Sequence, residues 1–168
     1  MHGTGWDGIV VASAAGHPEA EGQSIQRMAD DRGCRPAEAA CDLIADARAR
    51  VMVVLHSMSP DDVDAIRAWP RAMIGSDGLP FPGRQHPRVA GALAKVMGEA
   101  ARAGTLADAV HRNTAMATER FAIPDRGVVR AGKVADLVVL DPAVVADRAT
   151  YEDPWAAPAG IEHVLLAG

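Results

Sequence analysis

One carboxylate, Asp77, stands between glycines directly after an apolar run. Gly75 and Gly78 allow the backbone to turn sharply and leave the Asp77 side chain uncrowded. Ligands of α/β folds gather at the carboxyl ends of parallel strands, so Asp77 is a candidate general base or metal contact. The same Ser-Asp-Gly run is also common turn chemistry, and the local sequence alone favours a simple turn.

Groups that could bind an anion follow in the next segment. Arg88 stands at the start of an expected helix, where its guanidinium fork could hold a substrate carboxylate, although a solvated surface arginine is the ordinary alternative. His86 lies in the same segment. His56 follows the apolar run 51–55, which places it at the same expected end of the sheet as Asp77, where a polar rim residue is the commoner finding.

The sequence contains no recognisable metal site of its own. The other histidines show no His-x-His and no His-Glu-x-x-His spacing, and the two cysteines, Cys34 and Cys41, form no Cys-x-x-Cys pair. We expect both to be buried thiols. A nucleophile elbow, a P-loop and a dinucleotide fingerprint are also missing from the sequence.

Strands and helices are expected to alternate over the first part of the chain. Ser24 suits a helix cap, Gly33 a helix stop and Pro36 a first helical turn. The β-branched run 51–55 is typical of a strand covered on both faces, and the alternation is typical of βα units around a parallel sheet. The expected strands are 8–13, 51–55 and 72–75, and the expected helices are 24–32, 36–47, 60 onward, 87–103, 106–112 and 115–121.

After Pro124 the pattern changes to short β runs separated by turn residues. The runs are 128–129, 132–141 and 161–166, and they predict a β module. The sequence therefore predicts an α/β region over residues 1–122 and a β segment over residues 123–168.

Composition narrows the class of protein. The chain has 168 residues, of which 49% are hydrophobic and 23% charged, and a net charge of -5, values typical of a soluble globular protein. There is no apolar run of the length of a membrane span, no basic block that could track phosphates, and no Lys or Arg before Arg27. We therefore expect a cytoplasmic protein that binds neither a membrane nor nucleic acid.

Several motifs, in order along almost the whole chain, resemble those of the N-acyl-D-amino-acid deacylases, or D-aminoacylases, of the metal-dependent amidohydrolase superfamily. The combination is more specific than any single motif. The matching segments are Trp6–Val10, Glu21–Ile25, Met73–Leu79, His86–Arg88, Asp125–Gly127, Gly132–Pro142, Asp147–Tyr151 and Gly160–Val164.

The resemblance implies the last βα units of a TIM-like barrel, followed by strands of a small β-sandwich. It implies an enzyme that uses zinc to hydrolyse a small-molecule N-acyl-D-amino acid. Asp77 matches the carboxylate that acts as general base on the metal-bound water and can also contact the metal. Arg88 matches the residue that holds the free carboxylate of the substrate, and His86 lies beside it as a further substrate-binding candidate.

The resemblance also has gaps. The metal ligands of the family, an early His-x-His, a bridging Cys or carboxylated Lys and two further histidines, have no counterpart in this sequence, and a full barrel needs about 250 residues. The resemblance therefore covers only the carboxyl-terminal portion of such an enzyme, which we expect to be inactive alone. Two alternatives remain, a non-catalytic partner that associates with another chain through unpaired barrel strands, and a cyclic amidase of the hydantoinase or dihydroorotase type.

Overall fold

The first two α-helices begin and end where the sequence places their caps. In the computed structural model, which describes residues 4–81 and 83–168, helix α1 spans Ile25–Arg32 and helix α2 spans Pro36–Asp46. The Ser24 hydroxyl accepts a hydrogen bond of 3.1 Å from the backbone N–H of Arg27, and α1 ends at Gly33. Both expected helices are confirmed.

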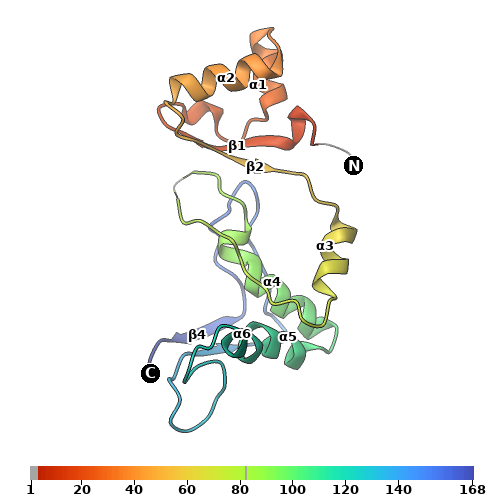
Figure 1. Ribbon diagram of the computed structural model, residues 1–168, viewed down its shortest axis with the longest axis vertical. Helices are drawn as coiled ribbons and strands as arrows, with labels where there is room; N and C mark the ends of the chain where they lie inside the picture. Colours follow the sequence, from red (N-terminus) through yellow and green to blue (C-terminus); the bar gives the residue numbers. More distant parts are fainter. Residues whose placement is uncertain (1–3, 82) are drawn as a thin grey trace.

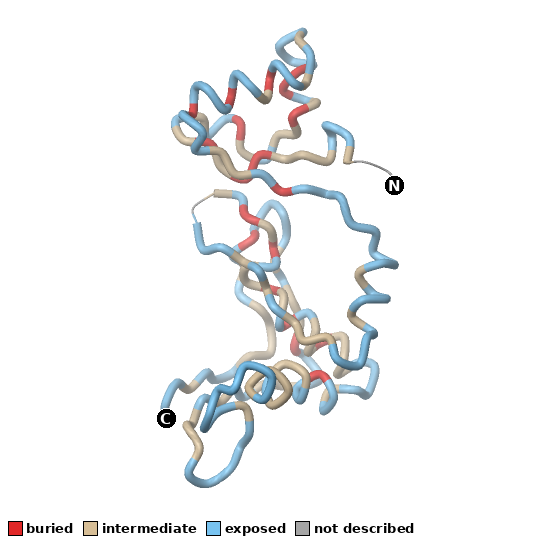
Figure 2. The backbone as a smooth tube through the Cα atoms, in the orientation of Figure 1, coloured by how far each residue is buried: buried red, intermediate tan, exposed pale blue. Residues whose placement is uncertain are grey.

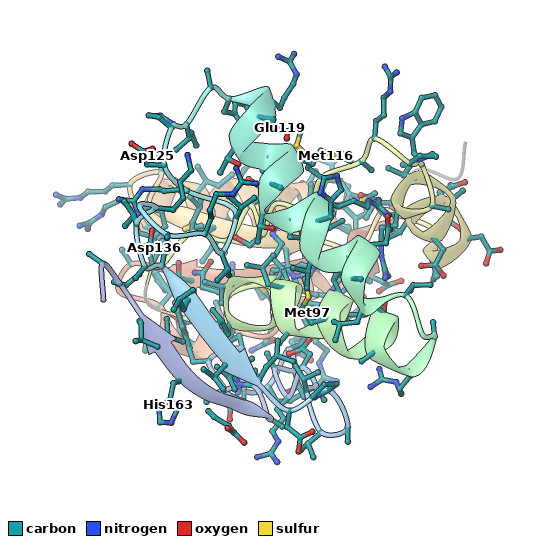
Figure 3. The ribbon with its side chains drawn as sticks, turned by 90° about the horizontal axis from the view of Figure 1, so that it is seen from below. Met97, Met116, Glu119, Asp125, Asp136 and His163 are labelled. Atoms are coloured by element: carbon teal, nitrogen blue, oxygen red, sulfur yellow. The ribbon has the colours of Figure 1, made fainter. Side chains whose placement is uncertain are left out.

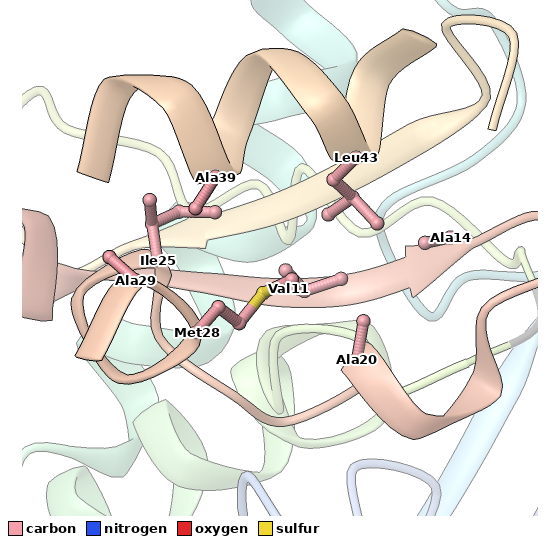
Figure 4. Close-up of a cluster of buried hydrophobic side chains, with 8 residues drawn as sticks. All are labelled: Val11, Ala14, Ala20, Ile25, Met28, Ala29, Ala39 and Leu43. Carbon is pink, nitrogen blue, oxygen red and sulfur yellow. The ribbon is translucent and has the colours of Figure 1, made fainter. Parts of the chain in front are cut away.

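The two helices cover one face of a two-stranded sheet (Figure 1). Strand β1 (Ile9–Ala14) pairs with β2 (Val51–Leu55) in antiparallel register, with an irregularity between Val11 and Ser13. The 3-10 helix η1 (Trp6–Gly8) precedes β1, and a second, η2 (Pro18–Ala20), follows it. One cluster of buried side chains fills the space between helices and strands (Figure 4): Val11, Ala14, Ala20, Ile25, Met28, Ala29, Ala39 and Leu43.

Strand β2 is only partly covered. Val53 and Leu55 are exposed, so the expectation that this strand is covered on both faces is wrong. The neighbouring Val54 is buried, and the Gly83–Arg84 segment contacts β1 at Ala12. The cysteine expectation is wrong as well, because Cys34 is only half-buried and Cys41, on the outer side of α2, is exposed.

The segment after helix α3 (Pro60–Arg67) is irregular. The strand expected at 72–75 is not formed. A strand needs neighbouring backbone groups to bond, but here the Ala72 N–H donates to Trp69 within a turn, and the Ala72 carbonyl accepts 2.8 Å from Arg112 Nε. Arg112 also donates to the carbonyls of Arg67 and Trp69, so one side chain holds the turn that follows α3.

Three further helices and a second sheet follow. Helices α4 (Arg88–Arg102), α5 (Leu106–Asn113) and α6 (Ala115–Arg120) lie close to their expected positions. Strands β3 (Leu137–Leu140) and β4 (Ile161–Leu165) pair in antiparallel register. The run 132–141 is thus a strand only over its last residues, and 128–129 forms no strand. Within residues 4–81 and 83–168, no helix is long and apolar enough to cross a membrane.

The mixed α/β content is confirmed, but the expected parallel sheet is not seen in this chain. The described strands form two separate antiparallel pairs, β1 with β2 and β3 with β4. Parallel barrel strands bond to a neighbour on each side, and the segment expected to be one such neighbour, 72–75, is instead irregular. The barrel and sandwich assignment, and the boundary at residue 122, remain predictions.

An apolar groove separates the second sheet from α4 and α5. It encloses about 740 Å³ and includes Leu93 and Met97 of α4, Val110 of α5, and Leu140 and Ile161 of the sheet. Figure 3 shows α4, with Met97, beside the β3–β4 ribbon, and shows His163 projecting outward from the sheet. Figure 2 shows that the buried residues are concentrated in the amino-terminal unit, which comprises β1, β2, α1 and α2, and along α4.

Small residues of α4 allow a distant loop to approach the helix closely. Gly91, Ala94 and Gly98 are its buried positions, and Val145, only 1% exposed, lies in the loop that contacts it. A Cβ atom on Gly91 would overlap the Asp147 carboxylate, and one on Gly98 would overlap the Val145 carbonyl oxygen. The loop before Tyr151 is thereby fixed against the helix that begins with Arg88.

Replacing Gly98 by Ala should therefore destabilise the protein. Overpacking lowers the free energy of unfolding by about 1–3 kcal/mol, whereas the higher helix propensity of Ala raises it by about 1 kcal/mol. We expect the free energy of unfolding to fall by about 1 kcal/mol in denaturant titrations. Gly75→Ala is the matched control, because nothing lies within 4 Å of a Cβ there. Equal stability of Gly98→Ala and the wild type would show that the loop moves freely on α4.

Candidate functional site

Asp77 occupies an exposed turn with its carboxylate directed to Arg88. Its φ is 46°, in the left-handed region that Asp tolerates better than most residues. The turn itself uses Ser76, whose hydroxyl accepts a hydrogen bond of 3.3 Å from the Gly78 N–H. Oδ2 of Asp77 lies 2.8 Å from Nη2 of Arg88, with the two side chains 82% and 44% exposed. The carboxylate is therefore used in an ion pair rather than in an Asx-turn.

The loop that leads to Arg88 is fastened to the amino-terminal sheet. The backbone N–H of Arg84 donates to the Ala12 carbonyl at 2.7 Å, at the irregularity of β1. Gly83 makes this approach possible, since its φ is 104° and a Cβ there would crowd Ala12 and Ser13. This hydrogen bond fixes the segment just before α4 against β1, and so limits the movement of Arg88 at the start of the helix.

His86 uses both of its ring nitrogens. Nδ1 lies 3.1 Å from the backbone N of Arg88, and Nε2 lies 3.2 Å from the hydroxyl oxygen of Tyr151. The Tyr151 ring also packs against His86 edge to face, at 5.3 Å between centroids. His86 therefore joins the start of α4 to the segment after the Val145 loop.

His56 reaches the same cluster from the end of β2. Its backbone N–H donates to the Gly8 carbonyl at 2.8 Å, which extends the β1–β2 pairing by one position. The His56 ring lies 4.7 Å from the Tyr151 ring, tilted by 58°. The tyrosine ring is consequently in contact with two histidine rings, one at the end of β2 and the other just before α4.

Partial burial and local positive charge set the protonation of the cluster. Burial first, and then the charges of Arg88, His56 and Lys95, lower the pKa of His86 below its usual value. Burial raises the pKa of Tyr151, against the opposing effect of Arg88. At neutral pH the His86 imidazole and the Tyr151 phenol are therefore both neutral.

The structure brings together the residues that the sequence singled out, and adds one. Asp77 and Arg88 form an ion pair, His86 bonds to the Arg88 backbone, and His56 reaches the group through Tyr151. Tyr151 was not predicted as a site residue, although it closes the motif Asp147–Tyr151. Only its position beside two histidines far away in sequence identifies it, and no local pattern carries that information.

The side chains that could ligate a metal are dispersed over the described part of the chain. Across residues 4–81 and 83–168, no three His, Cys, Asp or Glu side chains gather in a group that could bind a metal ion. Asp77 has an arginine as its neighbour rather than a second ligand. Any metal that Asp77 contacts must take most of its ligands from elsewhere.

Comparison with known proteins confirms the resemblance to D-aminoacylases. No protein-family model matches the chain. The N-acyl-D-glutamate deacylase of Alcaligenes xylosoxydans xylosoxydans is 38% identical over 165 residues, covering 96% of this chain and 33% of that enzyme. The D-aminoacylase of the same organism is 38% identical over 154 residues, covering 90% and 31%. The chain thus spans about a third of the length of the curated relatives it matches.

Solved structures of deacylases are also similar to this chain. The N-acyl-D-glutamate deacylase of Bordetella bronchiseptica, complexed with zinc and a phosphonate that mimics the tetrahedral intermediate, has a TM-score of 0.89 at 39% identity, covering 96% of this chain and 34% of that one. A D-aminoacylase structure gives a TM-score of 0.86 at 35% identity, covering 95% and 33%. A further D-aminoacylase structure was determined to study its binuclear metal centre. These structural neighbours are metal-containing hydrolases.

Proposed function

We propose that this chain supplies the proton-transferring carboxylate and the substrate-binding arginine of a zinc-dependent enzyme that deacylates N-acyl-D-amino acids. It would act as the carboxyl-terminal portion of that enzyme. The observation that carries the proposal is the ion pair of Asp77 with Arg88, 2.8 Å apart, at the start of α4. The similarity to deacylases over 96% of the chain supports it.

Arg88 is suited to the one charge that every N-acyl-amino acid carries, its free carboxylate. A guanidinium binds a carboxylate with two parallel N–H bonds, and in this structure it already holds one, that of Asp77. A substrate carboxylate would take the place of Asp77 on Arg88. Binding of substrate would thus free the Asp77 carboxylate beside the amide that is to be cleaved.

Asp77 would then act first as general base and afterwards as general acid. A water molecule attacks the amide carbonyl carbon, and Asp77 accepts the proton that the water loses. The C–N bond breaks as Asp77 returns this proton to the amine nitrogen, which leaves a free carboxylic acid and a D-amino acid. The exposed position of Asp77 in this chain, 82%, leaves its carboxylate open to a partner surface that would complete the site.

A chimera tests the proposal directly. The chain would replace the matching third of the Alcaligenes N-acyl-D-glutamate deacylase, and hydrolysis of N-acetyl-D-amino acids would be measured against their L-enantiomers. We expect D-selective hydrolysis by the chimera. A folded chimera that retains bound zinc but hydrolyses none of these substrates would contradict the proposal.

The chain alone should neither hold zinc tightly nor deacylate N-acetyl-D-amino acids. A catalytic zinc site needs three protein ligands, and no such group is present in the described ranges. Metal analysis after dialysis and a deacylation assay check both expectations. Recovery of one zinc per chain, lost on mutation of His56 and His86, would show that the chain builds its own site.

The chain should also associate with itself in the absence of the rest of such an enzyme. Apolar side chains are exposed along β2, α3 and the following loop, among them Leu55, Met58, Ile66 and Trp69. The outer edge of β2 pairs with no other strand among the described residues, so its backbone groups are open to another chain. Size-exclusion chromatography with light scattering should detect oligomers, whereas one sharp monomer peak at micromolar concentration would contradict this.

A further inference from the structure

We propose that His86 and Tyr151 are positioning residues for Arg88, His86 by capping the first turn of α4 and Tyr151 by bracing the His86 ring. This inference rests on the proposed role of Arg88 in substrate binding. It gives the carboxyl-terminal segment, through Tyr151, a part in recognising the substrate carboxylate.

The hydrogen bonds define the tautomer of His86. The backbone N–H of Arg88 can only donate, so Nδ1, 3.1 Å away, must accept and carries no proton. A neutral imidazole then carries its proton on Nε2, which donates to the Tyr151 oxygen at 3.2 Å. The Tyr151 oxygen is therefore the acceptor of this bond, and its own O–H proton remains available for another acceptor.

His86 replaces a cap that α4 otherwise lacks. The first backbone N–H groups of a helix have no partner within the helix. The residue at the cap position, Pro87, makes no side-chain hydrogen bond to them. Nδ1 of His86 therefore satisfies the Arg88 N–H and fixes the backbone from which the guanidinium extends.

Tyr151 is itself held by contacts from three directions. Its ring lies between those of His56 and His86, at 4.7 and 5.3 Å. The preceding loop is packed on α4 at Gly91 and Gly98. Tyr151 thus connects the end of β2, the start of α4 and the carboxyl-terminal segment at one point. The low pKa of His86, which keeps the ring neutral, is consistent with this arrangement.

Nuclear magnetic resonance of the 168-residue chain tests the arrangement without any activity. Nitrogen shifts of the His86 ring at pH 7.5 should show a protonated Nε2 and an unprotonated Nδ1, with the Arg88 amide proton shifted downfield. His163, which projects from the sheet and is exposed, serves as the reference ring. Tyr151→Phe removes the acceptor of the Nε2–H proton, so the Nε2 shift should change and the downfield shift of the Arg88 amide proton should decrease, while Nδ1 stays unprotonated. A protonated Nδ1 in the wild type would overturn the proposal.

A matched pair of variants tests the consequence for Arg88. His86→Asn keeps an acceptor near the position of Nδ1, whereas His86→Gln places its amide near Nε2 and removes the cap. In the chimera, His86→Gln should raise KM for an N-acetyl-D-amino acid about fivefold to tenfold, as expected for a lost cap. It should change kcat less, and should leave the corresponding amide unaffected. His86→Asn should stay within about twofold of wild type.

The outcomes separate this inference from the proposed function. An inactive chimera would contradict the proposed function. The positioning role of His86 would then be tested in the isolated chain, by the ring shifts of His86 and by the Arg88 amide shift in His86→Asn and His86→Gln. An active chimera in which both variants lose activity equally, or in which acid and amide substrates suffer alike, would overturn the positioning role of His86.

Discussion

Asp77→Asn should lower kcat of the chimera by about 10²–10⁴-fold, because an amide keeps the shape of the carboxylate but cannot accept the proton of the attacking water. KM should not rise. Asp77 is the carboxylate that occupies Arg88 in this structure, so its neutralisation removes the competitor of the substrate carboxylate. Steady-state kinetics with an N-acetyl-D-amino acid gives both values.

Asp61→Asn is the control for this substitution, since Asp61 is an exposed carboxylate in the first turn of α3. It should leave kcat within about twofold of wild type. A loss below tenfold on Asp77→Asn would remove this residue from the proton transfer and leave it as a simple turn residue with a surface ion pair. Such a pair contributes about 0–1 kcal/mol to stability, so stability measurements would hardly detect it.

Arg88→Met should reduce kcat/KM for an N-acetyl-D-amino acid by about 100-fold, or about 3 kcal/mol, because two charge-assisted hydrogen bonds to the substrate carboxylate are lost. Methionine keeps much of the length of the side chain and removes its charge. Arg84→Met is the matched control, because Arg84 lies in the same loop and fastens it through its backbone N–H, which the substitution retains. A comparable loss in Arg84→Met would point to a general effect of charge in the loop.

The helices could be predicted because their signals are local. Ser24 and Gly33 define the ends of α1, and Pro36 begins α2, within a few residues of the positions that they control. The strand at 72–75 was predicted wrongly from such local signals, because a strand forms only with a pairing partner that the local sequence does not specify. In the structure its first carbonyl bonds to Arg112, a residue 40 positions away.

The same distinction applies to the candidate site. Asp77 and Arg88 were found from a glycine-flanked carboxylate and an arginine at a helix start, together with the family resemblance, and they do lie together. The bond between Tyr151 and His86 joins residues 65 positions apart, so no local pattern predicts that the two side chains meet. The fastening of Gly83 and Arg84 to β1 was missed for the same reason, since it depends on an irregularity in a distant strand.

The most direct test of the account is the discrimination between an acid and an amide substrate by Arg88. Values of kcat/KM would be measured for an N-acetyl-D-amino acid and its uncharged amide, each with the wild-type chimera and with Arg88→Met. We predict that the substitution lowers the value for the acid about 100-fold and changes the value for the amide less than about threefold. Equal losses for both substrates would show that Arg88 supports the fold and does not read the carboxylate, which would contradict the account.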